Sequence, residues 1–128
     1  MTAVSIAPWL SVRRGSEAVE FYKKAFDAIE LFNMESDDGA VVCQLSIEDA
    51  IFWLSDESPE HGNYAPESIE GKGSVKMLLM VSDPAVSFAK AIATGATAIS
   101  EVAEQHGWLV GRIADPFGHH WEICKQLE

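Results

Sequence analysis

The chain has 128 residues, of which 48% are hydrophobic, which suffices for one well-buried core and is too little for two ordinary domains. Its 20 acidic residues against 9 basic ones give a net charge of -11, which repels phosphate backbones and anionic lipids, so we expect neither nucleic acid nor a membrane as a partner. No segment has the pattern of a signal peptide or a membrane span, and Cys43 and Cys124 lack metal-site spacing. We therefore predict a cytoplasmic protein with reduced, structural thiols.

The first part of the chain predicts a strand, a helix and three further strands. Alternating apolar residues favour a strand over residues 6–12, after which Gly15 and Ser16 offer a break and a helix cap. An apolar stripe at helical spacing then runs to Phe26 beside exposed charges, which predicts a helix. Strand-like runs separated by turn residues follow at 29–35, 40–47 and 50–55.

The same order returns after a stretch without periodicity, residues 55–73, which we interpret as a connecting loop. A lid containing His61, Asn63 and Tyr64 is the alternative for this loop. A strand is expected over residues 75–81, and a helix between the cap residue Asp83 and the stop signal Gly95. Three more strands are expected at 97–102, 108–113 and 119–125.

The two halves therefore look like copies of one β-α-β-β-β unit. Trp53 and Trp121 are 68 positions apart, as are the pairs Asp27-Ala28 and Gly95-Ala96. We predict an α+β fold in one domain spanning residues 1–128, with one module at about 5–56, a linker at about 57–73 and a second module at about 74–126. An ordinary α+β sandwich with accidental internal similarity is the alternative.

Three segments resemble the glyoxalase/bleomycin-resistance/dioxygenase superfamily, also called vicinal oxygen chelate, and its PhnB-like branch in particular. They are residues 18–26 (AVEFYKKAF), 107–112 (GWLVGR) and 115–123 (DPFGHHWEI). The resemblance implies two modules that form an open U-shaped barrel around a ligand cavity, usually completed in a homodimer. Such proteins include metal-dependent lyases, isomerases and dioxygenases, and also metal-free proteins that sequester drugs, so the fold alone does not identify the reaction.

The resemblance also implies where metal ligands would lie, namely near Ala7, Leu54, Lys76 and Glu122. Only Glu122 has a side chain of a ligand type, and Lys76 adds a repelling cation. We therefore expect no bound metal and no cofactor.

Strand alternation predicts which side chains face the cavity. If Glu122 points inward, His120 and Cys124 do so too, while Trp121 packs beneath the helices. Applying the repeat puts Phe52 and Leu54 in the cavity and Trp53 in the core. The same alternation turns Trp9, Lys76, Trp108 and Arg112 inward, and the repeat matches Arg112 with Gln44. The predicted ligand-binding residues are thus Trp9, Gln44, Phe52, Lys76, Trp108, Arg112, His120 and Glu122.

We predict a metal-free protein that binds a small aromatic or anionic molecule, with Arg112 and Lys76 holding an acid group and Trp9 and Trp108 stacking on a ring. Several alternatives stay open. Arg112 can form an internal ion pair with Glu122, Glu122 can act as a general base, and the tryptophans can fill the core or a dimer interface. A metal-dependent lyase, isomerase or dioxygenase of the same superfamily is the alternative function. A methyltransferase is disfavoured because no glycine-rich turn links a strand to a helix.

Overall fold

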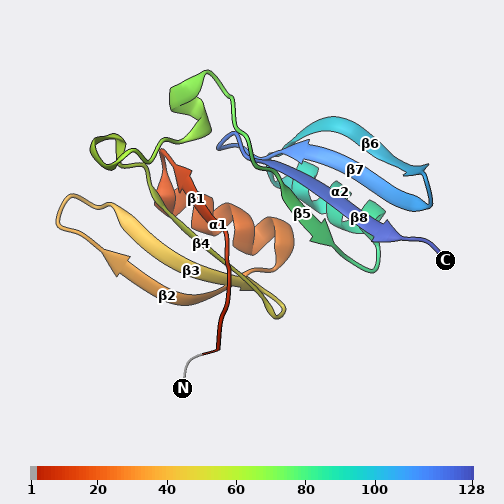
Figure 1. Ribbon diagram of the computed structural model, residues 1–128, viewed down its shortest axis with the longest axis horizontal. Coiled ribbons are helices and arrows are strands. Elements are labelled where there is room, and N and C mark those ends of the chain that lie inside the picture. Colours follow the sequence, from red (N-terminus) through yellow and green to blue (C-terminus); the bar gives the residue numbers. More distant parts are fainter. Residues whose placement is uncertain (1–2) are drawn as a thin grey trace.

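The computed structural model describes residues 3–128 and contains two β-α-β-β-β modules side by side (Figure 1). The first consists of β1 (Trp9–Val12), α1 (Gly15–Phe26), β2 (Ile29–Glu35), β3 (Val41–Ile47) and β4 (Ala50–Asp56). The second consists of β5 (Met77–Met80), α2 (Pro84–Thr94), β6 (Thr97–Gln105), β7 (Trp108–Ala114) and β8 (His120–Gln126). The linker between them contains two 3-10 turns, η1 (Pro59–His61) and η2 (Pro66–Ile69).

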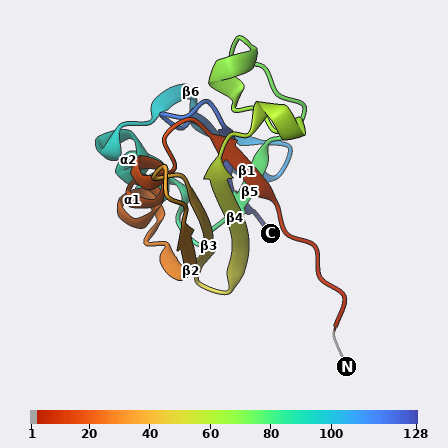
Figure 2. The same cartoon turned by 90° about the vertical axis from the view of Figure 1, so that its left-hand side faces the viewer.

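Each module forms a four-stranded sheet, with strand orders β1-β4-β3-β2 and β5-β8-β7-β6. The two orders are equivalent, and in each the first strand runs parallel to the last. The helices gather on one side of the sheets and contact each other, which leaves the opposite face of each sheet uncovered (Figure 2). The predicted α+β architecture with open sheets is therefore confirmed.

The two helices begin in different ways. Asp83 caps α2 as predicted, because its Oδ1 accepts a hydrogen bond from the backbone N–H of Val86 at 3.3 Å. The expected cap of α1 by Ser16 is not formed. Instead Asp56, at the end of β4, accepts the N–H of Gly15 at 2.9 Å and that of Val41 at 2.8 Å. A carboxylate distant in sequence thus satisfies the start of α1.

An aromatic cluster between the helices and the sheets joins the two modules. Tyr22 of α1 lies 5.4 Å from the ring of Phe52 in β4 and 5.5 Å from the ring of Trp121 in β8, measured between centroids. Trp121 is 2% exposed, which confirms its predicted place in the core. Among the described residues, no helix has the length and apolar character needed to cross a bilayer.

The prediction for β4 is wrong by one residue. Phe52 is 3% exposed and Leu54 is fully buried, so both lie in the core, whereas Trp53 lies on the uncovered face and stacks on Trp9. The register explains the error, because Gln44 pairs with Trp53 while Arg112 pairs with Glu122. Gln44 and Arg112 are 68 positions apart, but Trp53 and Glu122 are 69 apart. The last hairpin therefore has one extra turn residue, and a shift of one residue moves every side chain to the other face.

Candidate ligand-binding site

The uncovered face of the first sheet carries a row of three aromatic side chains and one glutamine, which we call the aromatic row: Trp9, Trp53, Gln44 and Phe32. These residues are consecutive register partners across all four strands. The rings of Trp9 and Trp53 are stacked, with centroids 5.5 Å apart, and the ring of Phe32 lies 5.9 Å from Trp53. The indole Nε1 of Trp9 donates a hydrogen bond to Ser55 Oγ at 2.8 Å, which fixes the orientation of this ring.

The equivalent row of the second sheet has a different chemistry. It consists of Leu78, Glu122, Arg112 and Ser100, again consecutive register partners, and we call it the charged row. Glu122 Oε2 lies 3.1 Å from Lys76 Nζ and 3.7 Å from Arg112 Nε. The internal ion pair considered as an alternative for Glu122 is thus present. It is incomplete, since the buried Nε of Arg112 has no hydrogen-bond partner among the described residues.

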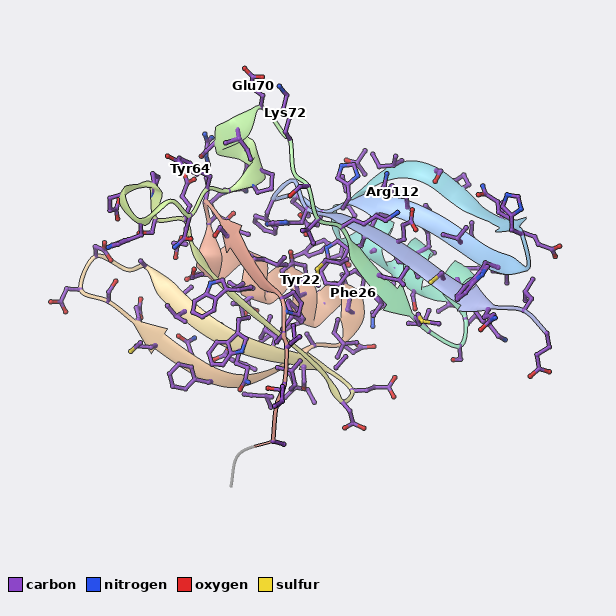
Figure 3. All side chains as sticks on the ribbon, viewed as in Figure 1. Tyr22, Phe26, Tyr64, Glu70, Lys72 and Arg112 are labelled. Atoms are coloured by element: carbon purple, nitrogen blue, oxygen red, sulfur yellow. The ribbon has the colours of Figure 1, made fainter. Side chains whose placement is uncertain are left out.

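A cavity of about 850 Å³ lies where β1, β5 and the last hairpin meet the linker, and we call it the junction cavity. Its volume falls in the range typical of sites for small molecules. The cavity takes side chains from both modules and from the linker; Figure 3 shows the linker rising above the sheets, with Tyr64 and Lys72 on it and Arg112 on the second sheet. The residues with polar or aromatic side chains that line it are Trp9, Tyr64, Lys72, Ser74, Lys76, Arg112, His119 and His120.

A smaller pocket of about 300 Å³ lies on the uncovered face of the second sheet, and we call it the sheet pocket. Leu78, Trp108, Val110 and Cys124 give it an apolar lining, with Glu122 at its side. Trp108 thus belongs to the same sheet face as Arg112, as predicted, but to a different cavity.

The predicted ligand-binding residues are therefore distributed over four places. The junction cavity contains Trp9, Lys76, Arg112 and His120, and the sheet pocket contains Trp108 and Glu122. Gln44 lies in the aromatic row. Phe52 lies in the core and cannot reach a ligand on the uncovered face.

Sequence reasoning missed Trp53 and Phe32 on the first sheet, and Lys72 in the linker. The sequence feature that could have drawn attention to Lys72 is its position between Gly71 and Gly73. The segment has no hydrophobic periodicity and is therefore interpreted as a plain loop. Tyr64 was considered only as part of an alternative lid. Linker residues are hard to place because periodicity says nothing about irregular segments.

The two thiols are poorly suited to nucleophilic chemistry. Burial raises the pKa of Cys43 from 9.0 to about 11, and burial also raises the pKa of Cys124. Since the thiolate is the reactive form of cysteine, both side chains are inert at neutral pH. This agrees with the structural role predicted for them.

The positions that correspond to metal ligands in the superfamily do not offer a metal-binding donor set. Leu54 is buried beneath the sheet, and Lys76 is engaged with Glu122. His119 donates from Nε2 to the carbonyl oxygen of Ser11 at 2.8 Å. Within residues 3–128, no group of three His, Cys, Asp or Glu side chains is placed to hold a metal ion.

Residues 9–124 match the family model of the glyoxalase-like domain. The chain belongs to this family. The superfamily indicated by the three sequence motifs is therefore confirmed. This glyoxalase-like protein is 35% identical, over 128 residues, to an uncharacterized protein of Mycobacterium bovis, covering 96% of the present chain and 84% of the relative.

Two solved structures share the fold of this glyoxalase-like protein. The X-ray structure of an Arabidopsis thaliana gene product is 30% identical with a TM-score of 0.71, covering 96% of this chain and 98% of that one. TnmS3, described as an antibiotic binding protein from a Streptomyces species, is 18% identical with a TM-score of 0.68, covering 98% and 99% of the two chains. The second similarity is one of fold only.

Proposed function

We propose that this glyoxalase-like protein binds a small aromatic or anionic molecule without a metal, and that a homodimer completes its binding surfaces. The feature that best supports metal-free binding is the side-chain chemistry around Glu122. Lys76 and Arg112 neutralise this carboxylate, and Leu54 is buried in the core. Two cations, which suit an anionic organic ligand, thus lie at the position where a metal-using relative needs oxygen and nitrogen donors.

The similarity to TnmS3 supports this proposal at the level of fold. That protein is described as binding an antibiotic, so the architecture is compatible with small-molecule binding. No observation favours the alternative of a metal-dependent lyase, isomerase or dioxygenase, because these enzymes need several metal ligands at the positions discussed above. Membership of the PhnB-like branch and a cytoplasmic location stay predictions from the sequence.

Dimerisation is supported by the uncovered sheet faces. Large apolar side chains are exposed there on both modules, and groups of exposed apolar side chains often mark an interaction site. They include Trp9, Phe32, Met34, Leu78 and Met80. A twofold arrangement brings the first sheet of one copy against the second sheet of the other, so that the aromatic row faces the charged row.

The binding proposal can be tested with a flat aromatic acid that quenches tryptophan fluorescence, such as 4-nitrobenzoate. We expect saturable quenching with a Kd in the micromolar range, because a charged hydrogen bond and ring stacking together contribute about 2 to 4.5 kcal/mol beyond burial. Trp9→Phe removes much of the quenching, since Trp9 lines the junction cavity. Trp108→Phe is the matched control, because Trp108 lines the sheet pocket. Unchanged fluorescence across a panel of aromatic acids would contradict the proposal.

The absence of a metal requires a separate measurement. Protein purified without chelators is expected to contain well below one equivalent of zinc, nickel, iron or manganese, measured by elemental analysis. About one equivalent per chain would show that the metal-free proposal is wrong.

A further inference from the structure

We infer that the junction cavity selects organic anions that carry one negative charge, and that Arg112 holds the anionic group. The inference rests on the proposed function and narrows its ligand class from aromatic or anionic molecules to monoanions. The evidence is the distribution of charge around the cavity, the incomplete pairing of Arg112 and the apolar surface beside it.

Charge is strongly segregated at the junction cavity. Its lining contains three of the nine Lys and Arg residues and two of the four histidines, but none of the 20 acidic residues. In a chain with a net charge of -11, a lining drawn at random would contain more acidic than basic residues. The molecule as a whole is strongly negative, but the lining of this cavity is positively charged. This local positive charge favours anionic ligands in the cavity.

The guanidinium of Arg112 lacks a complete set of partners. Its Nε is buried without a hydrogen bond, and the nearest carboxylate oxygen, Glu122 Oε2, is 3.7 Å away, which is too long for one. A buried polar group without a partner is costly and commonly indicates a missing ligand or water. The planar fork of arginine matches a carboxylate or another planar anion. Because Arg112 lines the cavity and its side chain is 32% exposed, the terminal Nη atoms of the guanidinium can bind a carboxylate there.

The count of neighbouring charges indicates a monoanion. The cations of the lining are Lys72, Lys76 and Arg112. Outside the lining, Glu122 pairs with Lys76 and contacts Arg112, and Glu70 lies 3.2 Å from Lys72. The two glutamates neutralise two of these three cations, so the lining keeps one net positive charge. A ligand with one negative charge balances it, whereas a second negative charge would find no free cation.

An apolar surface lies beside this anion position. Trp9 is 55% exposed, and Tyr64, Ile69 and Met77 line the same cavity. The exposed indole of Trp9 offers a stacking surface for a ring, and the aliphatic side chains accept its apolar edges. The combination fits an aromatic carboxylate better than a small inorganic anion.

Four naphthalene derivatives of similar shape can test the charge selection by isothermal titration calorimetry. They are 2-naphthoate, the neutral 2-naphthamide, the cationic 2-naphthylmethylammonium and the dianionic 2-naphthyl phosphate. We expect 2-naphthoate to bind at least tenfold more tightly than the amide, and the ammonium compound to show no measurable binding. The phosphate is expected to bind no more tightly than the carboxylate.

Two substitutions test the role of the charged row. Arg112→Gln should reduce the affinity for 2-naphthoate to that for the amide and leave the amide unchanged, while Lys125→Gln, on an exposed residue outside both cavities, serves as the matched control. Glu122→Gln should increase the affinity for 2-naphthoate severalfold, because it removes the carboxylate that competes for Lys76 and Arg112. A merely structural role of Glu122 would have no such effect.

The outcomes separate this inference from the proposed function. If the neutral, cationic and anionic compounds bind equally well, the protein binds small molecules but the charge selection is wrong. Tenfold tighter binding of the phosphate would overturn the single-charge assignment, and unchanged 2-naphthoate affinity in Arg112→Gln would overturn the role of Arg112. Weaker 2-naphthoate binding in Glu122→Gln would contradict the charge balance. If no naphthalene compound binds, the proposed function itself fails.

Discussion

Asp115 shows how one buried carboxylate organises the region beside the junction cavity. Its Oδ2 accepts hydrogen bonds from the Tyr22 hydroxyl and from Trp121 Nε1, the latter at 2.9 Å. Its Oδ1 accepts the backbone N–H groups of Phe117 and His119, both at 3.0 Å. Asp115 thereby holds α1 of the first module against the last turn of the second, and that turn continues into residues of the junction cavity.

Replacing this carboxylate is expected to destabilise the protein strongly. Asp115→Ala leaves three buried donors and one partly buried donor without their acceptor, so we expect the free energy of unfolding to fall by about 3 kcal/mol or more. Tyr22→Phe is the matched control, because it removes one donor and leaves the other three in place, with an expected loss of about 1 kcal/mol. Urea denaturation followed by circular dichroism measures both values. Equal losses in the two variants would show that Asp115 does not organise this network.

Several buried acidic groups, among them Cys43 and Tyr22, predict a loss of stability at alkaline pH. Burial raises the pKa of Cys43 to about 11, and burial, followed by the neighbouring Asp115, raises the pKa of Tyr22 well above its ordinary value of 10.0. Below pH 9 both groups are protonated in the folded and unfolded chains. Above that pH the unfolded chain releases the Cys43 proton first, and from about pH 10 also the Tyr22 proton, so unfolding is favoured.

The free energy of unfolding is therefore expected to fall as pH rises from about 9 to 11, with a contribution from Cys43 on the order of 2 kcal/mol. Denaturation midpoints measured at intervals of half a pH unit provide the curve. Cys43→Ala should flatten it in this window, and Tyr22→Phe should flatten it above pH 10. An unchanged slope in both variants would mean that other groups dominate alkaline unfolding.

At the scale of elements, the packing of α2 on the second sheet depends on a glycine in β7. A Cβ added to Gly111 would lie 2.7 Å from Val102 Cγ2 and 2.9 Å from the ring of Phe88. Such distances are well inside normal van der Waals contact, so the helix or the neighbouring strand would have to move. The glycine thus permits the close approach of α2 to the sheet that carries Arg112.

Gly111→Ala is expected to lower the free energy of unfolding by about 1 to 3 kcal/mol, because overpacking in a well-packed core has this typical cost. Gly73→Ala is a suitable control, since no atom lies within 4 Å of its added Cβ and its φ is not positive. We expect the control to change stability by less than about 0.5 kcal/mol. Thermal denaturation of the two variants distinguishes the cases, and a neutral Gly111→Ala would contradict the packing argument.

The linker is more ordered than its irregular sequence suggests. Glu57 accepts the N–H of Ala65 at 2.9 Å and the hydroxyl of Ser68 at 2.8 Å, and these hydrogen bonds lower the pKa of its carboxyl group. Arg14 donates to the carbonyl of Pro116 at 3.0 Å and lies 3.4 Å from Glu67. The linker is therefore held together by its own hydrogen bonds and tied to Arg14 of the first module, which in turn contacts Pro116 of the second. It forms a wall of the junction cavity.

At the scale of the whole molecule, the exposed aromatic row makes the proposed homodimer testable. We expect a mass near 28 kDa, about twice the 14.0 kDa of the chain, in light scattering at micromolar concentration. Phe32→Glu should shift the mass toward that of the monomer, because it puts a charge on a surface that the partner would cover; Phe32 is 44% exposed in the single chain.

Lys24→Gln changes the net charge by the same amount as Phe32→Glu, on an exposed residue of α1, and we expect it to keep the dimer. A monomer mass for the unaltered protein would show that the uncovered faces serve another purpose. A dimer that survives Phe32→Glu would place the interface elsewhere on the molecule.

The sequence by itself determined the two modules, the order of their elements and the family, because hydrophobic periodicity and turn residues are local signals. Asp83 shows this well, since both its capping role and the start of α2 follow from neighbouring residues. The placement of Trp9, Arg112 and Glu122 on the faces of their sheets that the helices do not cover also followed from local alternation.

Only the tertiary structure showed which side chains of β4 lie on the uncovered face of the sheet. It alone also showed which residues line the junction cavity. Trp53 and Trp121 are the same residue type in repeated segments, yet one extra residue in the last turn puts them on opposite faces of their sheets. Pattern reasoning cannot see such a shift when both faces accept large apolar side chains. The cavity likewise joins Lys72 of the linker to Arg112 of β7, and residues so distant in sequence meet only when the modules pack together.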